Sequence, residues 1–214
     1  MIETASGLIL RTRPLTETSV IVHWLTPQLG RLATVAKGAR QPKSPFRGKL
    51  DLFYRADFSF VRSRRSDLHT LREVALQDTH SAIRKDLAYL QLASYVAALT
   101  EQTTEPETPL PGIFALTQGF LDVLPRQRPQ PQLIFAFEIK LLGELGLEPD
   151  LSDVRLTPGA TEILKALRNT DWEAVSRIKP AAAQTTELRQ FLHGFLIYHL
   201  GKLPANRATL FKEV

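Results

Sequence analysis

The side chains of this sequence best suited to chemistry are cations gathered between Lys37 and Lys49. This stretch reads Lys-Gly-Ala-Arg-Gln-Pro-Lys-Ser-Pro-Phe-Arg-Gly-Lys and holds five cations and no acid. No Asp or Glu occurs from Thr18 through Leu50, so nearby carboxylates in the sequence do not neutralise the charge. Lysine and arginine in such a run suit the phosphate groups of a polyanion. We therefore predict phosphate contacts from the basic loop, defined as residues 37–49, through Lys37, Arg40, Lys43, Arg47 and Lys49.

A second group of cations lies at the tip of a predicted hairpin over 62–67 and consists of Arg62, Arg64 and Arg65. If both groups share one face of the fold, they form a strip that follows a DNA or RNA backbone. Phe46 lies inside the basic loop and is the best candidate for stacking on bases. Phe58 and Phe60 point to one face of a predicted strand and are expected to fill the core. The alternative is that the basic loop is only solvated, as most isolated charge runs are.

The excess positive charge is confined to the first part of the chain. Residues 1–80 contain 13 Lys/Arg and 7 Asp/Glu, whereas residues 81–214 contain 14 and 15, within a total of 27 and 22. With 214 residues, of which 43% are hydrophobic, the chain can bury a substantial core. This asymmetry predicts a polyanion-binding module joined to a nearly neutral scaffold.

Sequence features of an enzyme are missing. The chain has no cysteine, which excludes disulfides and thiolate-ligated zinc or iron–sulfur sites. Its eleven glycines form neither G-x-G-x-x-G nor a Walker A loop. Of its five histidines, His23, His69 and His80 have no acidic or nucleophilic neighbours at motif spacing, and His193 and His199 are six apart on a predicted helix and so cannot hold a metal together. We expect a protein that is not an enzyme and that needs no metal or cofactor.

The N-terminal sequence has no basic segment followed by a long apolar run. No other segment approaches the roughly 18 uninterrupted apolar residues of a membrane span. We expect a cytoplasmic protein.

Short strands are predicted over the first part of the chain, at 5–12, 18–26, 30–37, 51–62 and 67–77. Pro27 and Gly30 supply a tight turn between the second and third of them. Five short strands with one long loop fit an OB-type barrel, and an SH3-like barrel has similar dimensions. The sequence therefore predicts an α+β fold, all-β and then all-α, with an OB-type five-stranded barrel over residues 1–80 and a helical domain over residues 81–214.

Helical periodicity replaces strand alternation after residue 80. Apolar residues at i, i+3, i+4 and i+7 share one helical face in two segments, Leu92, Tyr95, Val96 and Leu99, and Leu188, Phe191, Leu192 and Phe195. Further helices are predicted at 111–124, 130–146 and 158–169, with a short one near 171–178. Gly146 is expected to end the helix over 130–146 in a left-handed conformation.

Several segments of the sequence have the form of known family motifs. They are Gly7-Leu8-Ile9-Leu10, Leu15-Thr16-Glu17-Thr18-Ser19, Leu25-Thr26-Pro27 with Gly30, Val35-Ala36-Lys37-Gly38-Ala39-Arg40 with Lys43-Ser44, and the later run Phe137-Glu138-Ile139-Lys140-Leu141-Leu142-Gly143-Glu144-Leu145-Gly146. Together they resemble the RecO family of bacterial DNA repair and recombination mediators. The resemblance spans most of the chain in the family's order. The Thr-Pro/Gly turn followed by Ala-Lys-Gly-Ala-Arg is its most specific element.

The resemblance implies an OB-fold that binds single- and double-stranded DNA, strand annealing without nucleotide hydrolysis, and loading of recombinase together with RecR. It also implies that the helical domain receives the C-terminal tail of the single-stranded DNA-binding protein. Lys140 lies on the matching helix, where an ordinary surface lysine is an equally good interpretation. Many relatives carry a four-cysteine zinc module, whereas here Leu147–Leu151 runs almost directly into Leu156-Thr157, so no zinc is expected.

Two other functions fit the same residues. One is an RNA-binding OB protein, because phosphate contacts do not read the bases. The other is an interaction adaptor whose basic loop docks an acidic protein tail. Competition between matched DNA and RNA oligonucleotides distinguishes the first from a DNA-binding protein, and the salt dependence of binding distinguishes the second.

Overall fold

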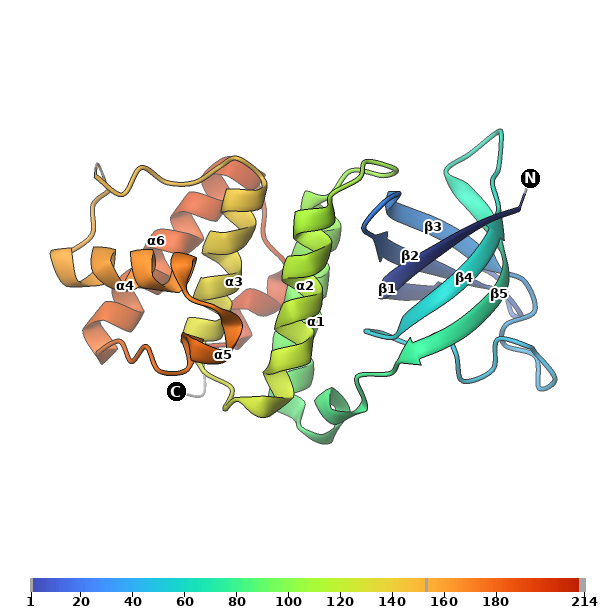
Figure 1. Cartoon of the computed structure of the whole chain (residues 1–214), viewed down its shortest axis with the longest axis horizontal. Coiled ribbons are helices and arrows are strands. Elements are labelled where there is room, and N and C mark those ends of the chain that lie inside the picture. Colours follow the sequence, from blue (N-terminus) through green and yellow to red (C-terminus); the bar gives the residue numbers. More distant parts are fainter. Residues whose placement is uncertain (1, 153, 212–214) are drawn as a thin grey trace. The chain divides into compact units, whose positions relative to one another are not determined.

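The computed structural model describes residues 2–152 and 154–211. The chain divides into two compact units, one made of Met1–Ser81 with Ala97–Gln118 and the other of Ala82–Val96 with Gly119–Val214. Strands occupy the first part of the sequence and helices the remainder (Figure 1). The predicted α+β class is confirmed, and the predicted domain boundary at residue 80 stays a prediction.

Five strands close into a barrel in the order β1-β2-β3-β5-β4. They are β1 (Ile2–Pro14), β2 (Val20–Thr26), β3 (Gly30–Ala36), β4 (Arg55–Val61) and β5 (Leu68–Asp78). The first half of the long strand β1 pairs with β4 and its second half with β2. β3 and β5 close the barrel by a short parallel pairing, from Ala33↔Leu68 to Val35↔Thr70. This closed order identifies the OB-type barrel, one of the two architectures that the strand pattern allows.

Alternating apolar residues from all five strands fill the barrel. Trp24 is fully buried and stacks on Phe58, with ring centroids 4.1 Å apart. Its indole Nε1 donates a hydrogen bond of 2.9 Å to Thr34 Oγ1, which satisfies the polar edge of the ring inside the core. Phe60 is also fully buried. The predicted core role of Phe58 and Phe60 is confirmed.

The turn between β2 and β3 is built as the sequence predicts. Gly30 has φ +65, and Thr26 Oγ1 donates to its carbonyl oxygen at 2.9 Å. A Cβ atom on Gly30 would lie 2.0 Å from the carbonyl oxygen of Thr108. Glycine is therefore required here both by its backbone conformation and by the close approach of another segment.

β4 begins four residues later than predicted, at Arg55. Phe53 has φ +67, so the chain turns there before the strand starts. Its N–H donates to Ile9 O, and Tyr54 O accepts from Ile9 N, both at 2.9 Å. Residues 53–54 thus hydrogen-bond to β1 near the register shift that separates Ile9 from Arg11.

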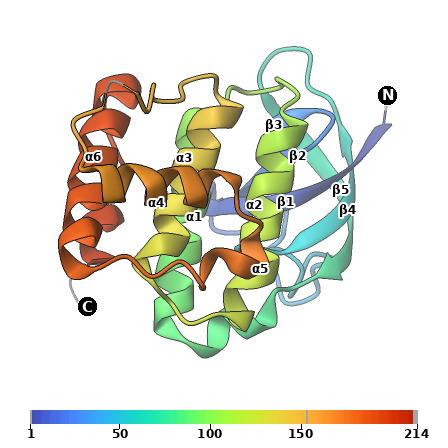
Figure 2. The same cartoon turned by 60° about the vertical axis from the view of Figure 1, so that its left-hand side comes forward.

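The α-helices are α1 (Leu87–Thr103), α2 (Pro111–Val123), α3 (Pro131–Glu144), α4 (Pro158–Asn169), α5 (Trp172–Val175) and α6 (Ala182–Leu200). Each predicted helix is present, and Gly146 after α3 has φ +68, as expected of a helix C-terminus. In the second unit, α4 contacts both α3 and α6 (Figure 2). Among the described residues, no helix is both long and apolar enough to cross a membrane.

A buried polar network joins helices of the second unit. Glu138 on α3 is fully buried and accepts two hydrogen bonds from the Arg207 guanidinium, at 2.7 and 2.8 Å. Tyr95 Oη donates to the same carboxylate at 2.5 Å. Burial raises the pKa of Tyr95 well above its usual value, so its hydroxyl keeps the proton it donates.

Candidate nucleic-acid interface

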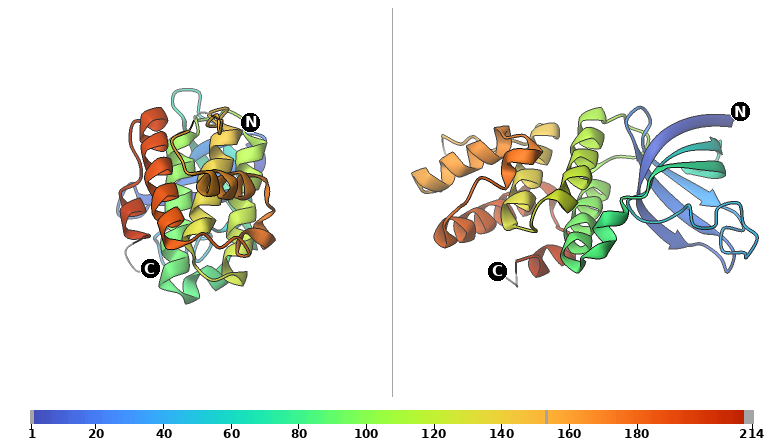
Figure 3. Two further views of the ribbon diagram at one scale, coloured as in Figure 1. Left: turned by 90° about the vertical axis from the view of Figure 1, so that its left-hand side faces the viewer. Right: turned by 60° about the horizontal axis from the view of Figure 1, so that its bottom comes forward.

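The basic loop is an ordered series of turns that leaves β3 and leads to β4. Five backbone hydrogen bonds of 3.0 to 3.3 Å each join a carbonyl oxygen to the N–H three residues later. The pairs are Ala36 and Ala39, Gly38 and Gln41, Gln41 and Ser44, Ser44 and Arg47, and Phe46 and Lys49. Gly38 and Gly48 have φ +69 and +71, which lets the chain reverse direction at both ends of the loop. The loop extends from the strands of the barrel (Figure 3). Its conformation is fixed by its own backbone, and so are the positions from which its cations project.

Phe46 anchors this loop in the barrel. Its side chain is only 7% exposed and belongs to the same core cluster as Trp24, Phe58 and Phe60. The stacking role predicted for Phe46 needs an exposed ring, and this ring is buried. The ring lies inside because the turns on either side of it carry the polar and charged residues to the surface and leave the one large apolar side chain facing the core.

The five cations of the basic loop face solvent without acidic partners. Four of them are exposed, and Lys49 is partly exposed. Within residues 2–152 and 154–211, none of the five forms an ion pair with a carboxylate. Arg47 Nη1 donates only to the carbonyl oxygen of Pro42, at 3.2 Å. The loop therefore presents uncompensated positive charge, the property that phosphate binding requires.

The hairpin between β1 and β2 is tied to the basic loop. Arg40 N donates to Thr18 O at 2.9 Å, and Arg40 Nη1 contacts Thr16 O at 3.5 Å. Arg13, at the end of β1, is also exposed. The hairpin tip, residues 14–19, thus lies beside the cations of the loop and belongs to the same surface.

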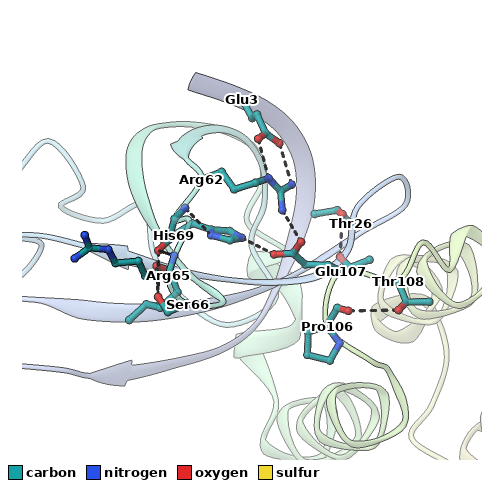
Figure 4. A network of polar contacts seen from close by, with 12 residues as sticks. Glu3, Thr26, Arg62, Arg65, Ser66, His69, Pro106, Glu107 and Thr108 are labelled. Atoms are coloured by element: carbon teal, nitrogen blue, oxygen red, sulfur yellow. Dashed lines mark hydrogen bonds and ion pairs between the residues drawn. The ribbon is translucent and has the colours of Figure 1, made fainter. Parts of the chain in front are cut away.

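Arg62, in the second predicted cluster, is held by two carboxylates (Figure 4). Its Nε and Nη2 donate to the two oxygens of Glu3 at 2.8 and 2.9 Å, and its Nη1 donates to Glu107 Oε2 at 2.5 Å. The hydrogen bond from Arg62 lowers the pKa of Glu3, which keeps this carboxylate ionised. Because Glu3 and Glu107 neutralise its charge, Arg62 is poorly suited to the phosphate contact predicted for it. Arg64 and Arg65 are exposed at the hairpin tip.

His69 holds the base of the same hairpin. It is 1% exposed, and its Nδ1 accepts a hydrogen bond of 3.2 Å from Ser63 N. Its Nε2, which lies 2.9 Å from Glu107 Oε1, is therefore the donor in that contact. Glu107 thus bonds to both Arg62 and His69 (Figure 4), although 45 and 38 residues separate them in the sequence. No sequence pattern near Arg62 indicates this partner.

The two groups of cations lie at opposite ends of strand β4. The basic loop leads into the start of β4, where Arg55 pairs with Asp78, and the hairpin of Arg64 and Arg65 follows its end, where Val61 pairs with Thr70. Figure 1 shows the two connections on opposite sides of the barrel strands. Seven residues of strand span about 23 Å. The continuous strip considered from the sequence is thus interrupted, and the basic loop with the adjoining hairpin tip is the larger candidate site.

Lys140 is a poor candidate for an edge cation in the second unit. Its Nζ donates to Arg168 O at 2.7 Å and lies 5.8 Å from the centroid of the Trp172 ring. Burial lowers its pKa. Another place in this unit combines charge with apolar surface, a cavity of about 240 Å³ lined by Arg189, Gln190, His193, Arg207, Ala208 and Phe211.

Comparisons with known proteins agree with the resemblance found in the sequence. The family model described as "Recombination protein O N terminal" matches residues 1–80, and that described as "Recombination protein O C terminal" matches residues 84–154. A relative named DNA repair protein RecO from Exiguobacterium sibiricum is 32% identical over 152 residues, 71% of this chain and 60% of the relative. The Bacillus subtilis protein of the same name is also 32% identical, over 71% of this chain and 59% of its own length.

A longer match covers almost the entire chain. DNA repair protein RecO from Bacillus velezensis is 28% identical over 98% of this chain and 84% of its own length. The matched part of the chain thus spans about three fifths of the first two relatives and most of the third. Two adjacent family models, matched in the family's order, and relatives of one name together show that the chain belongs to the RecO family.

Proposed function

We propose that this chain is a DNA-binding mediator of recombination in DNA repair. It binds single- and double-stranded DNA through phosphates, brings complementary strands together and acts by binding rather than by catalysis. The supporting observations are membership of the RecO family, the names of its relatives and the OB-type barrel. The observation that carries the proposal is the ordered basic loop, whose five cations have no carboxylate partner among the described residues.

The proposed phosphate contacts are Lys37, Arg40, Lys43, Arg47 and Lys49, with Arg64 and Arg65 as a secondary group. Phosphate contacts position a strand without reading its bases, so binding is expected to be independent of sequence. That property suits annealing, because any two complementary strands must be accepted. The loop is already ordered without DNA, so little conformational entropy is lost when phosphates bind.

Affinity for single-stranded DNA across a range of salt concentrations tests the proposal. Each phosphate contact contributes a slope of about −0.7 in a plot of log K against log salt. Changing Lys37, Arg40, Lys43 and Arg47 together to Ala should flatten that slope by about 2 to 3. The matched control changes Arg126, Arg128, Arg177 and Lys179 of the second unit to Ala, which removes the same charge. An unchanged slope in the loop variant, or an equal loss in the control, would refute the assignment.

Competition between DNA and RNA oligonucleotides of one sequence is the second test. DNA should compete at least as well as RNA, since the relatives are named DNA repair proteins. A clear preference for RNA would instead support an RNA-binding OB protein. Failure of either polymer to compete would support docking of an acidic protein tail at the basic loop.

We further propose that RecR and the C-terminal tail of the single-stranded DNA-binding protein are partners, as in the loading of recombinase onto coated DNA. An acidic, apolar tail needs apolar surface with a cation at its edge. The cavity bordered by Arg189, Arg207 and Phe211 has both. Arg189 is the residue to change, because Arg207 is committed to Glu138. Arg189→Ala should weaken binding of a fluorescent acidic tail peptide without altering DNA binding.

A further inference from the structure

The surface beside the basic loop contains an exposed aliphatic side chain on an ordered tip. Leu15 is 47% exposed at the tip of the β1–β2 hairpin. Its N–H donates to Ser19 O at 2.9 Å, and Thr16 Oγ1 accepts from Ser19 N at 3.0 Å. The tip is therefore held in one conformation by its own hydrogen bonds. Turn tips usually carry Gly, Asn, Asp, Ser or Pro, so a leucine here is exposed without any evident structural need.

This tip is coupled to the cations. Arg40 of the basic loop donates its backbone N–H to Thr18 O at 2.9 Å, and Arg13 is exposed two residues before Leu15. A strand whose phosphates contact the basic loop would therefore pass close to an apolar side chain held on a rigid support. Leu76 on β5, 37% exposed, is another exposed large aliphatic residue of the barrel, but it lies on a strand rather than at the tip.

The tip itself is poorly suited to phosphate. Glu17 is exposed within it and adds a negative charge beside the cations. Phosphates are therefore favoured at the basic loop and disfavoured at the tip. Bases carry no net charge, and apolar contacts to bases are insensitive to that carboxylate. Phe46, the only aromatic residue of the basic loop, is buried in the core and leaves the bases without a partner there.

We propose that Leu15 is a base-contacting residue, an apolar wedge that inserts between neighbouring bases of a strand bound by the basic loop. Leucine and proline side chains inserted in this way partly unstack a base step. The β1–β2 loop is also one of the loops with which OB-folds contact oligonucleotides. A wedge here separates two tasks: cations hold the backbone, and Pro14-Leu15 opens the stack so that base edges are available for pairing with a second strand. The inference rests on the proposed DNA binding.

A single-stranded oligonucleotide that contains 2-aminopurine tests the wedge, because this base fluoresces more strongly when it is unstacked. Saturating wild-type protein should raise the fluorescence. Leu15→Ala should remove at least half of that rise and weaken binding about tenfold, because it deletes three side-chain carbons of which only about half the surface is exposed in the free protein and so available for burial by DNA. The salt slope should stay unchanged, because no charge is removed. Leu15→Met keeps the apolar volume and should retain the rise, and Leu76→Ala is the control for an exposed leucine elsewhere on the barrel.

The outcomes separate this inference from the proposed function. A fluorescence rise that is the same for Leu15→Ala and wild type would overturn the wedge while salt-dependent binding stands. An equal loss in Leu76→Ala would also overturn it, since the effect would then not be local to the tip. Absence of salt-dependent binding by the wild-type protein would overturn both proposals. Because Leu15 is half exposed, the Ala variant should unfold at the same denaturant concentration as wild type.

Discussion

Replacing Phe46 distinguishes an anchor in the core from a ring that stacks on DNA. The side chain is 93% removed from solvent within the barrel core. A phenylalanine side chain buries at least ~150 Å² of apolar surface, which at ~25 cal/mol per Å² corresponds to about 4 kcal/mol. Phe→Ala changes in other cores cost about 3 to 5 kcal/mol. We expect Phe46→Ala to lower the free energy of unfolding of the barrel by about 3 kcal/mol or more.

Phe46→Leu is the informative second variant. Leucine retains most of the apolar volume, so the free energy of unfolding of the barrel should fall by about 1.5 kcal/mol or less. Leucine fills the core but cannot stack as an aromatic ring does. If Phe46 acts as an anchor, the Leu variant keeps the loop in place and binds DNA with nearly wild-type affinity. If Phe46 stacks on bases, the Leu variant loses affinity as the Ala variant does.

Denaturation in urea, followed by fluorescence of Trp24, measures the effect on the barrel. Trp24 is fully buried there, and the second tryptophan, Trp172, is replaced by Phe so that only the barrel is observed. DNA affinity is measured without urea, where wild type and variants are folded. The anchoring role would be refuted if Phe46→Ala lost DNA binding but lowered the free energy of unfolding by less than about 1 kcal/mol. That decrease is well below the usual range for core positions.

Three further changes test other parts of the structure. Gly30→Ala should destabilise the barrel strongly, because φ is +65 there and the new Cβ would meet another segment's backbone at 2.0 Å; loss of the cooperative barrel transition is the measurement. Glu138→Gln should lower the free energy of unfolding of the second unit by about 3 kcal/mol, since it leaves the buried Arg207 cation unpaired. A decrease of less than about 1 kcal/mol would contradict this role of the Glu138 carboxylate. Burial raises the pKa of Glu101, but the hydrogen bond with His23 and the positive charges of Arg11 and Arg31 together outweigh it and leave the pKa below the usual value. Its stabilisation is therefore present above about pH 4.3 and lost as the pH falls below this value through the folded-state pKa, so Glu101→Gln should flatten the acid limb of a plot of stability against pH.

The strands of the barrel were predictable because each is marked by a pattern of residues that lie close together in the sequence. Alternation around Trp24 and the Pro27/Gly30 turn are local features, and each strand end lies within a few residues of its predicted position. The late start of β4 was not predictable in the same way. It depends on the left-handed conformation of Phe53 and on its hydrogen bond to β1, and both require the folded barrel.

The candidate site was predictable in composition but not in geometry. The charge of the basic loop follows from the sequence alone, whereas the burial of Phe46 follows from a series of turns that has no periodic pattern. The loss of Arg62 from the site has a different cause. Its partner Glu107 comes from a segment 45 residues away, and an ion pair over that separation leaves no mark in the local sequence.

The short seam between β3 and β5 has a consequence for the newly made chain. Only three residue pairs join these strands, and the edge of β3 is continued by a bridge from Arg31 to Pro106 and a hydrogen bond from Glu107 N to Arg31 O. Residues 1–81 leave the ribosome before the segment that covers this edge, which follows roughly 1 to 5 s later at ordinary rates of synthesis. During that interval the edge of β3 is open to other strands. The nascent barrel is therefore most exposed to mispairing, and most in need of a chaperone, before residue 108 has emerged.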